Sequence, residues 1–260
     1  MKTYLDKITL VKNSRGVWSL DPIMGCASGT THTNGGCYES CYAARFAKRC
    51  GIDFSVSVKR HFKNAGHLQK IRNELSDLDM PFVRLGTNGD PSEDWNHTID
   101  VCEKIKSTGV KIVIITKHWQ SVPYLLLEKL KGICINTSIS ALDNDDLIEH
   151  RLHEYHRLKL YCNSVLRVNT CKFNLQTKEG KVLDNIQRTL LRNEFVLDNI
   201  LRLPLSHKLV KSGIVLVDRT KFLKSKVYAS VNDDKTYFGN CENCPDMCGI
   251  NLFRIDINNK

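Results

Sequence analysis

The sequence predicts an α/β protein built on a mostly parallel sheet. Short β-prone runs alternate with longer segments whose apolar residues recur at helical spacing, which is typical of a parallel sheet covered by helices. The run 111–115 is almost continuously apolar, as expected for a strand buried on both faces. Five or six strand-helix units are countable, roughly two fewer than the eight of a closed barrel, so we expect a partial (β/α) barrel.

Each expected element has a local signal. Turn residues or prolines follow the early strands, Gly51 ends the first helix, and Pro81 closes the second. Pro123 opens a helix, and the acidic run 143–146 caps the next one. The expected strands are 8–11, 17–20, 54–58, 82–85, 111–115, 133–139, 165–169, 200–203 and 214–217, and the expected helices are 37–49, 64–78, 94–107, 123–130, 143–161 and 183–192.

Composition narrows the class of protein. The chain has 260 residues, 11 cysteines and a net charge of +10, which favours a polyanionic partner such as a nucleic acid or nucleotide. No apolar run reaches the length of a membrane span and no signal-peptide pattern opens the chain, so we expect a cytoplasmic protein without a membrane partner. Residues 1–225 are expected to form the barrel domain, and residues 226–260 a cysteine knuckle packed on it.

Three cysteines, Cys26, Cys37 and Cys41, lie on a Gly-, Ser- and Thr-rich loop that runs into a helix. Cysteines clustered in a protein of a reducing compartment more often bind metal than form disulfides. Three thiolates suit an iron-sulfur cluster with one iron left open, which we favour. A structural zinc site completed by His32 is the alternative.

A second group, Cys241, Cys244 and Cys248, follows in the tail and is predicted to bind a metal. Zinc and an auxiliary iron-sulfur cluster both suit this spacing, and Cys162 or Cys171 is a candidate for a fourth ligand. Cys102 and Cys134, in apolar surroundings, are expected to be small core residues instead.

The segment Gly36-Cys37-Tyr-Glu-Ser-Cys41-Tyr-Ala, the later Gly89-Asp90 and the cysteine tail resemble the radical SAM superfamily, especially its phage- and mobile-element-associated relatives. The resemblance implies a TIM-like barrel, a [4Fe-4S] cluster on Cys26, Cys37 and Cys41, and S-adenosylmethionine (SAM) bound to its open iron. It also implies a 5′-deoxyadenosyl radical that abstracts hydrogen from a substrate, and an electron donor such as flavodoxin or ferredoxin. The Cys26-x10-Cys37-x3-Cys41 spacing departs from the superfamily's usual Cys-x3-Cys-x2-Cys.

Residues at the carboxyl ends of the expected strands are the candidate SAM ligands, since functional groups of such sheets collect at that edge. Ordinary strand termini and a helix cap at Asp90 are the alternatives. His118 with Trp119 is a candidate for the substrate pocket, whereas His150, His153 and His156 suggest a solvated helix face. The candidates for SAM binding are Asn88, Gly89, Asp90, Ser138, Ser140 and Arg167.

The sequence thus predicts a SAM-dependent radical enzyme of undefined substrate. The alternative from another class is a non-catalytic, zinc-stabilised nucleic-acid-binding protein, whose lysines contact phosphate. A third hypothesis is a degenerate barrel that keeps the cluster as a structural or redox element.

Overall fold

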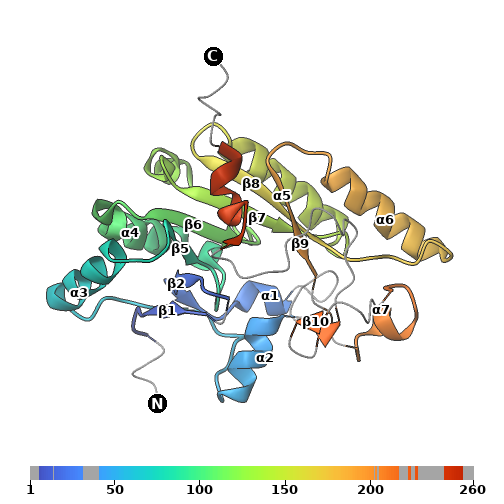
Figure 1. The fold of residues 1–260 in the computed structure, drawn as a ribbon, viewed down its shortest axis with the longest axis horizontal. Helices are drawn as coiled ribbons and strands as arrows, with labels where there is room; N and C mark the ends of the chain where they lie inside the picture. The colour runs from blue at the N-terminus through green and yellow to red at the C-terminus, as the bar shows by residue number, and fades with distance from the viewer. Residues whose placement is uncertain are drawn as a thin grey trace.

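The computed structural model describes residues 6–13, 15–31, 41–201, 203, 205–216, 222–223, 226–227 and 243–253. Within them the chain forms an α/β fold around a seven-stranded sheet of order β1-β2-β5-β6-β7-β8-β9 (Figure 1). Only the β1–β2 pair of this sheet is antiparallel. The strands are β1 (Leu10–Lys12), β2 (Trp18–Leu20), β5 (Phe82–Leu85), β6 (Lys111–Thr116), β7 (Cys134–Ile139), β8 (Asn163–Thr170) and β9 (Val196–Ile200).

Smaller elements join and cover this sheet. Two short antiparallel pairs stand apart from it, β3 with β4 and β10 with β11. These strands are β3 (Ile23–Met24), β4 (Val58–Lys59), β10 (Phe222–Leu223) and β11 (Lys226–Val227). The helices are α1 (Ala27–Thr31), α2 (Tyr42–Arg49), α3 (Ala65–Ser76), η3 (Pro91–Asp94), α4 (Trp95–Ile105), η4 (Lys106–Thr108), η5 (Tyr124–Leu130), α5 (Asp145–Leu158), α6 (Lys178–Leu190), α7 (Lys208–Lys211) and η7 (Met247–Phe253).

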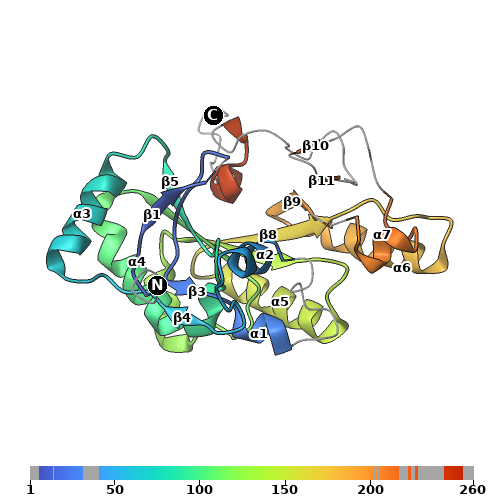
Figure 2. The same cartoon turned by 90° about the horizontal axis from the view of Figure 1, so that it is seen from below.

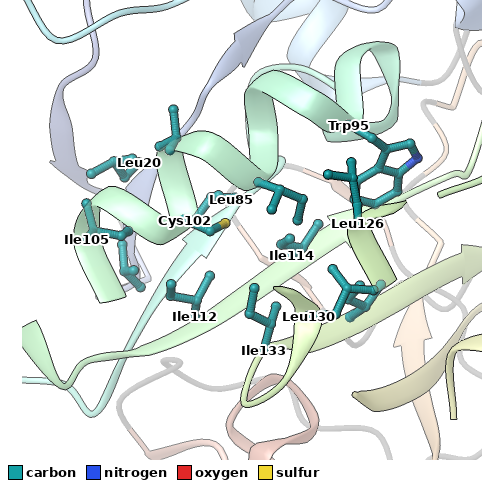
Figure 3. Packing of buried hydrophobic residues seen from close by; sticks show 14 of the residues in the cluster. Leu20, Leu85, Trp95, Cys102, Ile105, Ile112, Ile114, Leu126, Leu130 and Ile133 are labelled. Carbon is teal, nitrogen blue, oxygen red and sulfur yellow. The ribbon is translucent and has the colours of Figure 1, made fainter. Parts of the chain in front are cut away.

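The largest core cluster lies between one face of the sheet and the helices α3, α4 and η5. Alternate residues of β6 point into it, and Trp95 and Cys102 of α4 meet them (Figure 3). Burying aliphatic side chains of this size stabilises the fold by about 1.5–3 kcal/mol each. Cys102 is therefore a core residue, as the sequence predicts.

The other face of the sheet carries η7. Val113, Val165 and Leu197 from three parallel strands pack with Cys134 and with Cys248 of η7. Figure 2 shows η7 on the side of the sheet opposite α4 and α5. The described part of the tail thus packs on the sheet, and Cys134 is a core residue as expected.

The strand-helix alternation is confirmed, while several boundaries differ. The expected strand 200–203 begins earlier, at Val196, because Leu201 and Leu203 leave the sheet to pack around Phe173. The structure describes residues 214–216 of the expected strand 214–217, and of these Val215 makes an antiparallel bridge to Phe173. From β1 to β9 the described strands form an open row, and none of the described helices is long and apolar enough to cross a membrane.

Candidate functional site

A buried carboxylate organises the turn that follows β5. Asp21 Oδ1 accepts hydrogen bonds from the backbone N–H groups of Gly86 (2.9 Å) and Thr87 (2.8 Å). Its Oδ2 accepts from the backbone N and side-chain Nδ2 of Asn88, both at 3.0 Å. Burial raises the pKa of Asp21, although the bonds from Thr87 and Asn88 and the nearby Arg60 act against this. The Asn88 amide is therefore committed to Asp21, a residue that the sequence analysis did not single out although it directly follows a strand.

The backbone of Gly25, just before Cys26, is joined to this turn by hydrogen bonds. Gly25 N donates to Asn88 O at 3.0 Å, and Asp90 N donates to Gly25 O at 3.3 Å. Gly25 has a φ of +90°, and a Cβ there would lie 2.1 Å from Val56 O. A Cβ on Gly89 would lie 2.4 Å from Ile23 O. Both positions need glycine, because only glycine lets the two chains approach so closely. Cys26 is therefore held beside the Asn88–Asp90 turn, at the carboxyl end of β5, where the sequence predicts functional groups to collect.

Asp90 fixes the next turn of the rim, which is the edge of the sheet formed by the carboxyl ends of its parallel strands. Its Oδ1 accepts from Ser92 N (2.9 Å), Ser92 Oγ (2.8 Å) and Thr116 Oγ1 (2.6 Å), and its Oδ2 accepts from Lys117 N (2.7 Å). Asp90 also caps η3, which is the alternative role that the sequence suggested. Its carboxylate therefore connects the end of β5 to the end of β6.

Cys26 and Cys41 meet in one cluster. Both pack with Phe54, Trp119 and the small face of α2, which consists of Ala43, Ala44 and Ala47. Cys26 is buried, and its Sγ accepts a hydrogen bond from Trp119 Nε1 at 3.2 Å. Because Cys37 and His32 lie outside the described residues, the predicted ligand set is seen only in part. Within the described part of the chain, no group of three or more His, Cys, Asp or Glu side chains is arranged to hold a metal ion.

Cys41 takes a different position from the one expected. The sequence predicts a helix over 37–49, which includes Cys41, but Cys41 is the N-cap of α2 and has an extended backbone, with a φ of −63° and a ψ of 120°. The helix ends at Arg49, and Gly51 follows with a φ of +67°, as predicted. At the N-cap, Cys41 lies at the positive end of the dipole of α2, which stabilises a negatively charged sulfur.

Behind Trp119 lies a buried ionic group. Arg151 Nη1 is 2.7 Å from Asp143 Oδ2, and Lys117 Nζ is 3.3 Å from Asp143 Oδ1. Arg151 Nε donates to Lys117 O at 2.6 Å, and its guanidinium carbon lies 4.9 Å from the centroid of the Trp119 ring. Burial alone would raise the pKa of Asp143, but Lys117 and Arg151 outweigh it and hold that pKa below its usual value.

His118 and Trp119, which the sequence names together as candidates for the substrate pocket, have different surroundings. His118 is fully buried, and its Nε2 lies 3.1 Å from Thr137 Oγ1, so its ring belongs to the interior. Burial lowers the pKa of His118 to about 3, which keeps the ring neutral at physiological pH. His150 is not a purely solvated residue, since its Nε2 lies 2.8 Å from His118 O, whereas His153 and His156 are exposed.

Polar side chains continue along the carboxyl ends of β7, β8 and β9. Asn169 Nδ2 donates to Ser138 Oγ at 2.8 Å, Asn199 Nδ2 donates to Asn169 Oδ1 at 2.6 Å, and Arg167 Nη2 donates to Asn199 Oδ1 at 2.5 Å. Ser138 and Arg167 are paired in register across β7 and β8. Ser140 belongs to the neighbouring turn, where its N–H donates to Asp143 Oδ2 at 2.7 Å.

The tail group is also only partly described, since Cys241 lies outside the described residues. Cys244 and Cys248 belong to one turn, in which Met247 N donates to Cys244 O at 3.3 Å. Cys248 packs with Cys134 of β7, and its carbonyl accepts from Asn136 Nδ2 at 2.9 Å. Cys171 lies in a separate cluster around Phe173.

No protein-family model, curated protein or solved structure matches this chain. The function proposed below therefore depends on the residues of the site themselves.

Proposed function

We propose that this protein is a SAM-dependent radical enzyme on a partial (β/α) barrel, with a [4Fe-4S] cluster on Cys26, Cys37 and Cys41. The observation that carries the proposal is the convergence of Cys26 and Cys41 at the carboxyl edge of the sheet, beside the Asn88–Asp90 turn. When bound, the cluster and SAM supply a 5′-deoxyadenosyl radical for hydrogen abstraction from a substrate. Flavodoxin or ferredoxin is the proposed electron donor.

The described residues suit such a cluster. Thiolates are the preferred ligands of iron-sulfur clusters, and two of the three proposed ones belong to one cluster of mostly small and aromatic neighbours. The helix N-terminus at Cys41 favours the thiolate form, and Trp119 donates a hydrogen bond to the sulfur of Cys26. A set of three cysteines leaves one iron open for SAM.

The geometry sharpens the proposed SAM contacts. The side chains of Asn88 and Asp90 are bonded within the protein, and their carbonyls accept from Gly25 N and Glu93 N, so we assign the SAM ammonium to the backbone carbonyl of Gly89. Glycine at position 89 allows the close packing of chains at this turn. Ser138 and Arg167, at the carboxyl ends of neighbouring strands, are proposed to contact the remaining polar groups of SAM, and Ser140 to support them through the Asp143 turn.

The test is anaerobic purification followed by iron, sulfide and zinc analysis. We expect a brown protein that, once reduced with dithionite, converts SAM to 5′-deoxyadenosine and methionine. The matched control is the Cys26→Ala, Cys37→Ala, Cys41→Ala variant, which keeps the tail cysteines and should lose SAM cleavage. A colourless wild-type protein that holds only zinc and leaves SAM intact would overturn the proposal.

A nucleic-acid ligand is favoured by a separate observation, the outer face of α2. Tyr42 and Phe46 lie one helical turn apart and are 44% and 55% exposed. Arg45, Lys48 and Arg49 accompany them, and the helix contains no acidic residue. Exposed aromatic rings interleaved with cations suit stacking on bases and contact with phosphates of a single strand. This face supports a nucleic-acid substrate for the enzyme, and equally the second candidate function, a zinc-stabilised nucleic-acid-binding protein.

Binding is measured by fluorescence anisotropy with a labelled single-stranded oligonucleotide over a range of salt concentrations. We expect Phe46→Ala and Arg49→Ala to weaken binding, with about 1–3 kcal/mol lost per stacked base. Tyr124→Ala is the control, because Tyr124 is 79% exposed on η5, outside α2. Binding together with SAM cleavage supports the enzyme, whereas binding by a zinc-only protein supports the second candidate. Equal affinities for all three variants and wild type would remove α2 as the binding face.

The tail is proposed to hold a second metal, zinc or iron-sulfur, on Cys241, Cys244 and Cys248. Cys134 packs in the same cluster as Cys248, but Cys134, Cys244 and Cys248 are not arranged to hold a metal ion, so Cys134 stays a core residue. Cys171 is a weaker candidate than the sequence suggested, since it packs around Phe173.

A further inference from the structure

The indole of Trp119 lies between a cysteine sulfur and a buried cation. Its Nε1 is 3.2 Å from Cys26 Sγ, and the guanidinium carbon of Arg151 is 4.9 Å from its ring centroid. Trp119 follows β6, whereas Arg151 belongs to α5, so two distant segments of the chain meet at this ring.

The surrounding residues fix both partners of this contact. Trp119 N donates to Ser92 Oγ at 2.9 Å, and Ser92 is in turn bonded to Asp90. Arg151 is 0% exposed and is held by Lys117 O and Asp143. The indole N–H therefore points at the sulfur in an orientation that these contacts hold in place.

The charge behind the ring favours negative charge on the sulfur. Lys117 and Arg151 are the cations of this group, Asp143 pairs with both and Asp90 accepts from Lys117 N, and Arg151 is the cation that lies over the face of the ring. Water screens it little, because Arg151, Asp143 and Lys117 have side chains that are 0%, 2% and 13% exposed. A cation over the face of an indole withdraws electron density from the ring, which strengthens the N–H as a donor.

We propose that Trp119 and Arg151 are positioning residues that hold the Cys26 sulfur as a metal ligand and raise the reduction potential of a cluster bound there. The inference rests on the proposed function in one respect, namely that Cys26 binds metal. Residues that orient metal ligands in this way typically contribute about 10- to 100-fold to metal affinity. Hydrogen bonds to the sulfurs and nearby charge also set cluster potentials, because they stabilise the extra electron of the reduced state.

The key variant is Trp119→Phe, which keeps an aromatic ring and removes the N–H donor. Its matched control is Trp18→Phe on β2, which removes an indole N–H that donates to Asp79 Oδ1 at 2.6 Å. A second variant, Lys117→Met, removes one positive charge from the buried group without removing the N–H bond. Thermal unfolding of each variant establishes that it is folded before metal is added.

Two measurements separate a role at the sulfur from simple packing. Cobalt(II) binding, followed by the thiolate charge-transfer absorption, should be about 10- to 100-fold weaker in Trp119→Phe than in Trp18→Phe. The midpoint potential of the reconstituted cluster, followed by electron paramagnetic resonance, should be more negative in Trp119→Phe and in Lys117→Met than in wild type. These experiments use a triple Cys241→Ala, Cys244→Ala, Cys248→Ala background, so that only the first group reports.

The outcomes distinguish the inference from the proposed function. If wild type binds cobalt and Trp119→Phe matches Trp18→Phe in affinity and potential, the inference is overturned and the proposed function stands. If cobalt binds with the expected difference but no iron cluster assembles, the proposed function fails and the positioning role is supported. A background protein that binds neither metal would overturn both.

Discussion

The carboxylate of Asp90 gives the sharpest test of how the rim is built. It accepts four hydrogen bonds from within the protein, two of them from the backbone N–H groups of Ser92 and Lys117. In Asp90→Ala the two hydroxyl donors can rotate to other partners, whereas the two N–H groups lose theirs. Each unsatisfied buried group costs about 1–3 kcal/mol, so we expect the free energy of unfolding to fall by about 2–6 kcal/mol.

Two further variants make this expectation specific. Asp90→Asn keeps one acceptor oxygen and turns an NH2 group toward one N–H, so it should cost about half as much, about 1–3 kcal/mol. Asp53→Ala is the matched control, because Asp53 Oδ1 makes the same pair of bonds, to Ser55 N (2.9 Å) and Ser55 Oγ (2.6 Å), on an exposed turn. We expect Asp53→Ala to leave the unfolding midpoint unchanged.

The assay is urea-induced unfolding at neutral pH, supported by thermal midpoints, where about 1 kcal/mol corresponds to about 2–4 °C in a chain of this size. If Asp90→Ala unfolds at the same urea concentration as Asp53→Ala, the four bonds do not stabilise the rim and our reasoning is refuted. If stability is unchanged while SAM binding is lost, Asp90 contacts the cofactor directly instead.

Three other predictions concern pH, the core and the tail. The pKa of His118 is about 3 in the folded protein and about 6.5 when exposed, so the unfolded state binds the extra proton between these values. Stability should therefore fall as the pH drops below about 6.5, and urea midpoints at about pH 7.5 and pH 5 should converge in His118→Gln. On η5, Leu127→Ala should cost about 2–5 kcal/mol in the unfolding free energy, whereas Leu125→Ala should stay within about 0.5 kcal/mol, because these side chains are 2% and 93% exposed; equal costs would contradict the packing of η5. Cys244→Ser should lower the metal content by the share bound at the tail, whereas Cys134→Ser, which changes a core cysteine, should not, as metal analysis would show; an unchanged metal content in Cys244→Ser would contradict the tail site.

The apolar pattern and the residue spacing were enough to predict the strands of the sheet, but they predicted the ends of individual strands less reliably. The strand Phe82–Leu85 and the helix end at Arg49 agree with prediction, because buried apolar runs and a left-handed glycine are local signals. The sequence predicts a strand at 200–203, whereas the strand starts four residues earlier, at Val196. Asp198 and Asn199, which bond to polar partners on β8, interrupt the apolar run by which a buried strand is detected. Leu201 and Leu203, which formed that run, pack elsewhere.

The candidate site was predictable where it follows from topology. Cys26 and the Asn88–Asp90 turn come together because β2 lies parallel to β5 and Gly25 forms a parallel bridge with Gly89, just beyond the carboxyl end of β5. Arg151 was not predictable, because it lies among the histidines of a helix that reads as solvated, and only the three-dimensional position of Asp143 explains its burial. The hydrogen bond from Trp119 to Cys26 joins residues 93 positions apart, beyond the reach of any spacing argument.

The position of η7 also has a consequence for the order in which the molecule is made. The sheet face formed by Val113, Val165 and Leu197 is covered by residues 247–253, which leave the ribosome well after the strands themselves. Until then the nascent chain displays an apolar surface that is prone to aggregation. The sheet is therefore protected only after its strands have been made, and a chain truncated before residue 247 should accumulate in inclusion bodies even though the strands β1 to β9 are present.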